Sequence, residues 1–286
     1  MKNSYLLSFF WMMALTSFAQ TDSAKVKNKW TFYGLWGYNR WDYTRSTIHF
    51  HNEGTPGYDV PYHGPYDFTV YNVTASDKPD FNAIKDVANI TIPQFSLRFG
   101  FFMNNKKDEG WEFNYDHAKY VVDNGQTALV KGTILGHAVN KDSVLQYPFF
   151  HFEHTDGANF VQINYIKRWK VLKSKNGKNS LGILLKPGGG VVYPRTDVTL
   201  FSHRLNNAWH IAGFVAGVET GIRIELINNL CLEWTVKAVY TDYLWCFLQY
   251  QGHGNANHVF GAIGSIASLG YQFHARPPHI RFRKKN

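Results

Sequence analysis

Residues 213–243, GFVAGVETGIRIELINNLCLEWTVKAVYTDY, alternate apolar and polar side chains on both sides of a short Asn228-Asn229 turn. A period of two places successive side chains on opposite faces of a β-strand. One face of the two segments is apolar and the other is polar: Phe214, Val218, Ile222, Ile224, Leu232, Trp234, Val236 and Tyr240 against Glu219, Arg223, Glu225, Glu233, Thr235 and Lys237. The stretch therefore predicts a β-hairpin with one apolar face and one charged face.

Six further segments repeat this alternation, at 30–39, 94–101, 111–116, 161–165, 181–190 and 263–273. Apolar residues facing lipid, with polar or small residues between them facing a lumen, are typical of a transmembrane β-barrel. Beyond residue 20 no apolar stretch is long enough for a membrane-spanning helix, and aromatic residues make up 17% of the chain. We predict an all-β, antiparallel up-and-down transmembrane β-barrel of eight strands. Ten strands remain an alternative, because 67–74 and 127–134 also alternate.

The first residues predict export from the cytoplasm. Lys2 precedes an apolar run at 5–15, and Ser17-Phe18-Ala19 supplies the small residues that a signal peptidase requires. We therefore expect a signal peptide at 1–19 and a single barrel domain at 20–286, located in the outer membrane of a Gram-negative cell.

The lengths of the connections predict the orientation of the barrel. Short connections fall at 104–110, 174–180 and 228–229, whereas long ones fall at 42–91, 123–150, 194–208 and 244–257. Outer-membrane barrels keep short turns in the periplasm and long loops outside. The four long loops are therefore expected to be extracellular, and both termini periplasmic.

Charged residues on the inward faces predict a filled lumen. The expected inward charges form a plug of ion pairs: Arg98, Glu112, Lys186, Glu219, Arg223, Glu233 and Lys237. An eight-stranded barrel is just wide enough for side chains to fill it, so an open pore is not expected. Cys231 and Cys246 are placed near opposite ends of one strand, which is too far apart for a disulfide.

The net charge of +9 includes a basic tail expected in the periplasm: Arg276, Arg281, Arg283, Lys284 and Lys285. Nucleic acid is an unsuitable partner for an exported chain. The lipid bilayer, anionic lipid headgroups and the phosphates of lipopolysaccharide are the expected neighbours.

Histidines and carboxylates gather near the predicted extracellular rim. One cluster is Asp116-His117-Ala118-Lys119-Tyr120, and a second is Glu153-His154-Thr155-Asp156-Gly157. Counting by two from the lumen-facing Gln162 places His154 and Asp156 on the lumen side as well. Imidazole and carboxylate groups could act as a general base or bind a divalent metal ion of unknown identity, with His117, His154 and Asp156 as ligands. The alternative is that both clusters are ordinary polar residues at the bases of loops.

The segments EFNYDHAKYVV, HFEHTDGANFVQINYIKRW, KPGGGVVYPRTDV and GFVAGVETGIRIELINNLCLEWTVKAVYTDY resemble, in order and spacing, the lipid A oxidase-like outer-membrane proteins over residues 95–245. The positions that fall on the shared motifs are Asp116, His117, Lys119, Glu153, His154, Asp156, Gly157, Asn159 and Pro194. The resemblance implies an enzyme that uses molecular oxygen and a divalent cation to oxidise the proximal glucosamine of lipid A.

Two functional hypotheses follow. In the first, the catalytic residues Asp116, His117, Lys119, Glu153, His154 and Asp156 modify lipid A or lipopolysaccharide at the extracellular rim, while Lys119 and Arg195 neutralise its phosphates. In the second, the protein is a non-catalytic outer-membrane barrel with a ligand-binding or structural role.

Overall fold

The computed structural model describes residues 29–54, 64–78, 94–103, 108–154, 156–176, 178–206, 208–248 and 254–276. The predicted signal peptide at 1–19 and the tail beyond Arg276 lie outside these ranges. Residues 30–275 form one compact unit. In the described part of the chain, the regular elements are β-strands and one 3-10 turn, Ile227–Asn229. None of the described helical segments is long and apolar enough to cross a bilayer.

Eight strands pair edge to edge in a closed antiparallel ring, because the last strand pairs with the first along fourteen residues, from Trp30 opposite Ala275 to Tyr43 opposite Ala262. In ring order they are β1 (Trp30–Tyr43), β5 (Phe95–Phe102), β6 (Glu109–Asp116), β11 (Phe160–Lys173), β12 (Ser180–Val192), β15 (Gly213–Glu225), β16 (Leu230–Phe247) and β17 (Asn255–Ala275). The ring is the predicted up-and-down transmembrane β-barrel, and each segment named from the alternation lies in one of these strands, apart from Gln94, which precedes β5.

The two faces of the ring strands have the predicted polarity. Outward-facing apolar residues are exposed on every strand of the ring, for example Trp36, Phe99, Trp111, Ile163, Ile183, Phe214, Trp234 and Ile263. The predicted inward charges are all buried, from Arg98 on β5 to Lys237 on β16. The apolar residues of the alternating pattern therefore face lipid, and the polar residues between them face paired side chains in the lumen.

Short connections and long connections lie at opposite ends of the ring. The short ones join β5 to β6, β11 to β12 and β15 to β16, at the same end as Trp30 and Ala275. In the last of them Asn228 and Asn229 take positive φ angles of 65°, a conformation that Asn tolerates better than most residues. Three long connections, from β1 to β5, from β6 to β11 and from β12 to β15, leave the other end, as the sequence predicts. The fourth, predicted as a long loop at 244–257, is short, because β16 continues to Phe247 and β17 begins at Asn255.

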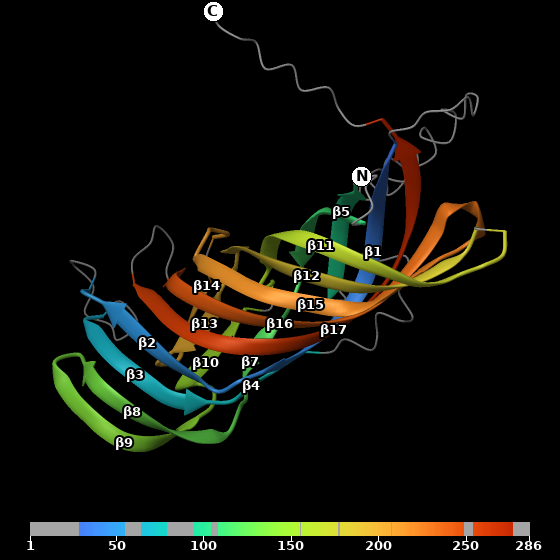
Figure 1. Cartoon of the computed structure of the whole chain (residues 1–286). Helices are drawn as coiled ribbons and strands as arrows, with labels where there is room; N and C mark the ends of the chain where they lie inside the picture. The colour runs from blue at the N-terminus through green and yellow to red at the C-terminus, as the bar shows by residue number, and fades with distance from the viewer. Residues whose placement is uncertain are drawn as a thin grey trace, which may run out of the picture. The chain divides into compact units, whose positions relative to one another are not determined.

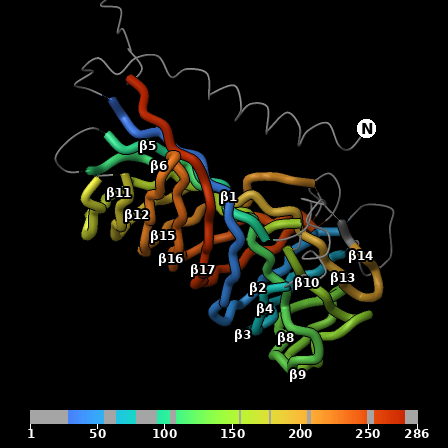
Figure 2. Tube along the Cα trace, turned by 90° about the vertical axis from the view of Figure 1, so that its right-hand side faces the viewer, coloured from blue at the N-terminus to red at the C-terminus, as the bar shows by residue number. Residues whose placement is uncertain are grey.

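The long connections are not irregular loops, which corrects the expectation from the sequence. Four strands extend the large sheet beyond β17: β2 (Ser46–Asn52), β3 (Tyr66–Val73), β8 (Gln126–Ile134) and β9 (His137–Leu145). A separate five-stranded sheet has the order β14 (His203–Asn206), β13 (Asp197–Leu200), β10 (Phe150–His154), β7 (Tyr120–Val122) and β4 (Ala75–Ser76). We call these nine strands the cap. Figure 1 and Figure 2 both show the cap strands gathered at one end of the ring strands.

The two extra alternating segments are strands, but they lie outside the ring. Segment 67–74 corresponds to β3 and segment 127–134 to β8, and these strands pair with each other from Tyr66–Ile134 to Val70–Val130. They therefore contribute to the cap and do not widen the barrel to ten strands.

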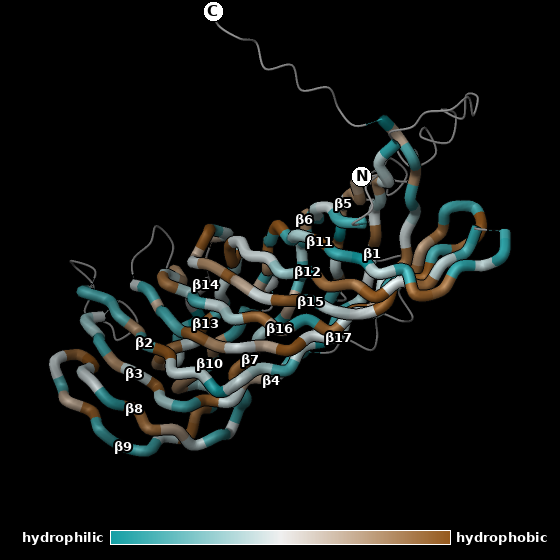
Figure 3. Tube along the Cα trace, in the orientation of Figure 1, coloured by the Kyte–Doolittle hydropathy of each residue, from teal (hydrophilic) through white to brown (hydrophobic). Residues whose placement is uncertain are grey.

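An apolar core lies between the two sheets of the cap. Ile48, Phe50, Phe68 and Val130 face it from the large sheet. The five-stranded sheet contributes Tyr120, Val122, Phe150, Phe152, Val198 and Leu200. Figure 3 shows apolar residues along the ring strands and along the cap strands alike. The same alternation thus serves lipid contact in the ring and core packing in the cap.

Candidate functional site

The lumen of the ring holds a continuous network of ion pairs. Lys186 Nζ lies 2.7 Å from a carboxylate oxygen of Glu233, 3.1 Å from one of Glu112 and 3.4 Å from one of Glu219. Arg98 donates to Asp116 at 2.9 Å and to Glu219 at 3.2 Å. Each of these six side chains is at most 2% exposed. The predicted plug of paired charges is present.

Asp116 belongs to this network, although the sequence placed it at a rim site. Its carboxylate accepts hydrogen bonds from Ser96 Oγ at 2.6 Å, Arg98 Nη1 at 2.9 Å and Lys237 Nζ at 2.6 Å. The side chain has no exposed surface. Asp116 therefore has a structural role, as the acceptor of three hydrogen bonds inside the lumen.

A second polar group lies where β6 and β11 reach the cap. The Oδ1 atom of Asn159 accepts hydrogen bonds from the Tyr115 hydroxyl at 2.9 Å and from His117 Nδ1 at 2.8 Å. The Asn159 amide also donates to the backbone oxygen of Tyr193 at 2.8 Å. Because Oδ1 is an acceptor, His117 carries its proton on Nδ1. Gly157 is required here, since a side chain at that position would meet the Asn159 amide and its φ is +123°.

Burial, one hydrogen bond and two charged residues determine the pKa of His117. The pKa of His117 lies below its usual value, mainly because the side chain is buried. The positive charge of Lys119 lowers this pKa further, whereas the hydrogen bond to Asn159 and the negative charge of Asp156 oppose the shift. Asp156 and Arg195 form a half-exposed ion pair of 2.8 Å. We call His117, Asn159, Asp156 and Arg195 the rim cluster. Two of its members, His117 and Asp156, are predicted metal ligands, and a third, Arg195, is the predicted phosphate-binding residue.

Lys119 and Glu153 have other neighbours. Lys119 is 8% exposed, and its backbone oxygen accepts a hydrogen bond of 2.5 Å from the Tyr43 hydroxyl. Glu153 lies 3.3 Å from Lys78 Nζ and 3.1 Å from His151 Nε2. Glu153 is therefore engaged with cap residues that the sequence did not single out.

His154 faces inward and is buried against Tyr243 and His258, two inward-facing residues of ring strands, but the lumen-facing position predicted for Asp156 is wrong, because its side chain is 51% exposed. The count from Gln162 assumed one continuous strand, but β10 ends at His154 and β11 begins at Phe160. The His154 side chain is fully buried and stacks on Tyr243 at 4.9 Å between ring centroids. Its nearest polar neighbours are His258 Nε2 at 3.1 Å and Thr196 Oγ1 at 3.2 Å.

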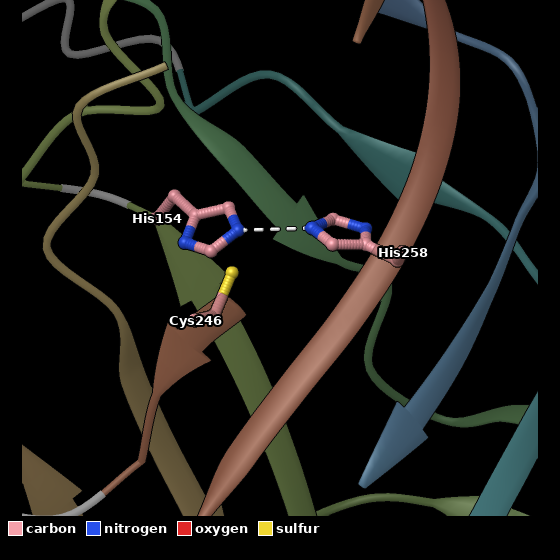
Figure 4. A group of neighbouring side chains, drawn as sticks. All are labelled: His154, Cys246 and His258. Carbon is pink, nitrogen blue, oxygen red and sulfur yellow. Dashed lines mark hydrogen bonds between the residues drawn. The ribbon is translucent and has the colours of Figure 1, made fainter. Parts of the chain in front are cut away.

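His154, Cys246 and His258 form a third group, shown in Figure 4. Within the described residues it is the one set of three or more His, Cys, Asp or Glu side chains whose ligand atoms all lie within 4.8 Å of one another. We call it the His-Cys cluster. Burial lowers the pKa of His258 to about 3 and that of His154 well below its usual range, so both imidazoles are neutral. His117 and Asp156 are not part of this cluster.

Sequence reasoning missed Cys246 and His258. Along β16 every second residue up to Tyr243 faces inward, which would place Cys246 outside. The pairing of β16 with β17 shifts between Tyr243 and Cys246, so Leu244 and Trp245 are both exposed and Cys246 turns inward. His258 follows the inward parity of β17, which the sequence interpretation began only at Ile263. Cys231 and Cys246 are both free, as expected from their separation.

Comparisons with known proteins place the chain in no family. No protein-family model matches it, and no curated protein matches it. The fold is similar to solved structures of Neisserial surface protein A (10% identity, 83% of this chain and 96% of that one, TM-score 0.30) and of outer membrane protein AlkL (12% identity, 92% and 98%, TM-score 0.31). It is also similar to Ail, the attachment invasion locus protein of Yersinia pestis (10% identity, 87% and 100%, TM-score 0.28). These TM-scores are too low to carry a functional argument, so the function is argued from the chain itself.

Proposed function

We propose that this protein is a non-conducting outer-membrane β-barrel whose ring anchors the cap on the extracellular side, where the cap acts as a ligand-binding or structural module. The filled lumen carries this proposal. Paired charges from strands all around the ring occupy the interior, and the Lys186, Glu112 and Glu219 side chains have no exposed surface. A lumen of this kind offers a solute no path, so the ring serves as an anchor.

Two further features support an anchor in a membrane. Exposed apolar side chains cover the outside of the ring, among them Trp234 at 56% and Ile263 at 59% exposure. A soluble protein rarely leaves so large an apolar surface in water, whereas a bilayer would cover it. The cap, in contrast, has its own apolar core and exposes charged residues such as Lys131, Lys141 and Asp142. It is therefore suited to the aqueous phase.

Cysteine labelling on intact cells tests the orientation that this function requires. Lys141→Cys places a thiol on exposed β9 in the cap, and Lys175→Cys places one in the exposed turn between β11 and β12 at the other end. Both natural cysteines are buried and free, so they contribute little background. We expect a membrane-impermeant maleimide to label the Lys141→Cys variant on intact cells, and the Lys175→Cys variant only after the outer membrane is permeabilised. The reverse pattern would place the cap in the periplasm and contradict the proposal.

The rim cluster supports a second candidate function, the modification of lipid A or a related outer-leaflet lipid. His117 uses Nδ1 for its hydrogen bond to Asn159, so Nε2 is the nitrogen that could take part in chemistry. The charge of Asp156 acts on His117, and the half-exposed Asp156–Arg195 pair is accessible to an anionic headgroup. An imidazole in this setting could accept a proton, and a guanidinium could bind a phosphate. Oxidation of the proximal glucosamine, with molecular oxygen and a divalent cation, is the reaction that the sequence resemblance implies.

Mass spectrometry of lipid A separates the two candidates. If the rim cluster is catalytic, lipid A from aerobic cells that express the protein should carry an oxidised glucosamine. This species should fall at least tenfold in a His117→Ala variant and persist in His137→Ala, which alters an exposed histidine of the cap. Identical lipid A with and without the protein would eliminate lipid A modification and leave the binding or structural role.

A further inference from the structure

The His-Cys cluster joins three separate parts of the chain where ring strands β16 and β17 meet the cap. His154 comes from the end of β10, Cys246 from the end of β16 after its bulge, and His258 from the part of β17 that pairs with β2 (Figure 4). None of the three side chains is exposed beyond 3%. His154 belongs to the five-stranded sheet, and the other two residues belong to the large sheet. A ligand bound by all three would therefore connect the five-stranded sheet of the cap to the ends of ring strands β16 and β17.

The two imidazoles are oriented as in metal-binding histidines. The Nδ1 atom of His154 lies 3.2 Å from the Thr196 hydroxyl, and Nδ1 of His258 lies 3.2 Å from the Ser46 hydroxyl. The two Nε2 atoms face each other at 3.1 Å. A histidine that binds a metal through one nitrogen usually donates the N–H of the other to an oxygen acceptor. With both Nδ1 atoms protonated in this way, two Nε2 lone pairs point to one place.

We propose that His154, Cys246 and His258 bind a single thiophilic transition-metal ion through two Nε2 atoms and one Sγ atom. Ligands of one such ion, at about 2.0–2.3 Å each, lie roughly 3.3–4 Å apart. The ligand atoms of the cluster lie within 4.8 Å of one another, so small side-chain rotations bring them to one ion. Imidazole and thiolate are the ligands that zinc and copper accept, whereas calcium and magnesium require oxygen.

The surroundings of the site favour Cu⁺ over Zn²⁺. The cluster is lined by aromatic rings, with Tyr120, Phe152 and Tyr243 all in contact with His154. Cu⁺ with one thiolate and two neutral imidazoles has no net charge, whereas Zn²⁺ would leave one positive charge. An uncompensated charge in an apolar interior is costly. Binding displaces the thiol proton of Cys246, and because the site is buried the ion enters as the cap folds.

Metal analysis of the untagged full-length protein tests this site. The protein is refolded in detergent with Cu⁺ under reducing conditions, or with Zn²⁺, then desalted, and bound metal is measured by mass spectrometry. We expect one equivalent of copper per chain. Cys246→Ser and His258→Gln should each reduce this at least tenfold. Cys231→Ser, which removes the other buried thiol of β16, should leave it unchanged.

Two measurements keep the outcome interpretable. The heat-modifiable migration of each variant reports whether the ring has folded, and X-ray absorption of the bound metal should show one sulfur and two nitrogen neighbours. Stoichiometric zinc with that same ligand set would support the site and overturn the assignment of Cu⁺. A folded wild-type protein that retains neither metal would overturn the proposal, as would bound metal with no sulfur neighbour or equal loss in Cys231→Ser. The test is independent of the ligand or activity of the cap.

Discussion

Replacing Lys186 with Met is expected to reduce the free energy of unfolding of the barrel by about 3–5 kcal/mol. Lys186 Nζ lies between three carboxylates, and neither it nor Glu112 or Glu219 has any exposed surface. Methionine fills a similar volume but leaves the carboxylates without this cation. Removing one partner from a buried ionic group is costly, because the remaining charge keeps its desolvation penalty. Denaturant unfolding in lipid vesicles, followed by tryptophan fluorescence and heat-modifiable migration, measures the change.

Two further variants test whether the effect comes from the lumen network. Lys141→Met removes an exposed lysine of the cap and should change stability by about 0.5 kcal/mol or less. Adding Glu233→Gln to Lys186→Met removes one of the stranded carboxylates and should recover part of the loss, with a coupling of about 0.5–3 kcal/mol. A Lys186→Met barrel as stable as the wild type would show that the remaining cations, Arg98 and Arg223, compensate fully for Lys186.

The ring was predictable because its pattern has few alternative explanations. Alternation over eight segments requires a sheet with one apolar and one polar face, and inward charges such as Arg98 and Glu219 have partners only if the sheet closes. The order of the strands followed from short and long connections. The cap was not predicted, because a strand that packs on a protein core alternates in the same way as one that packs on lipid. The pattern of β3 and β8 was visible, but their partners were not.

The site residues were harder to predict because their orientation depends on interruptions of the strands. Asp156 is exposed because β10 ends at His154 and the count by two is interrupted before β11, and Cys246 faces inward because a bulge follows Tyr243. Neither feature changes the local composition, so counting by two assigns both side chains to the wrong face. The grouping of His117 with Asp156 in one site stays a prediction, although the charge of Asp156 does raise the pKa of His117. The interaction of His154 with His258, 104 residues away, depends on the fold of the cap as a whole.

Replacing Phe50 with Ala is expected to destabilise the cap by about 3–5 kcal/mol while the ring still folds. Phe50 is fully buried, stacks on Phe68 of β3 at 5.0 Å, and meets Phe150 and Phe152 of β10 edge-on at 5.6 Å each. It therefore holds the two sheets of the cap together, and alanine would leave a cavity between them. Limited proteolysis should cleave the variant in the cap at least tenfold faster than the wild type, while its heat-modifiable migration persists.

Two matched variants test whether the faster proteolysis comes from lost packing in the cap core. Tyr147→Ala removes an aromatic ring that is 69% exposed and should leave the proteolysis rate unchanged. Phe50→Leu retains most of the side-chain volume, so its effect should be smaller than that of alanine if packing is the cause. Loss of heat-modifiable migration in Phe50→Ala would contradict the expectation. It would mean that the ring cannot close without the cap. This is physically reasonable only if the cap end of β17, which pairs with both β16 and β2, must form before β17 pairs with β1.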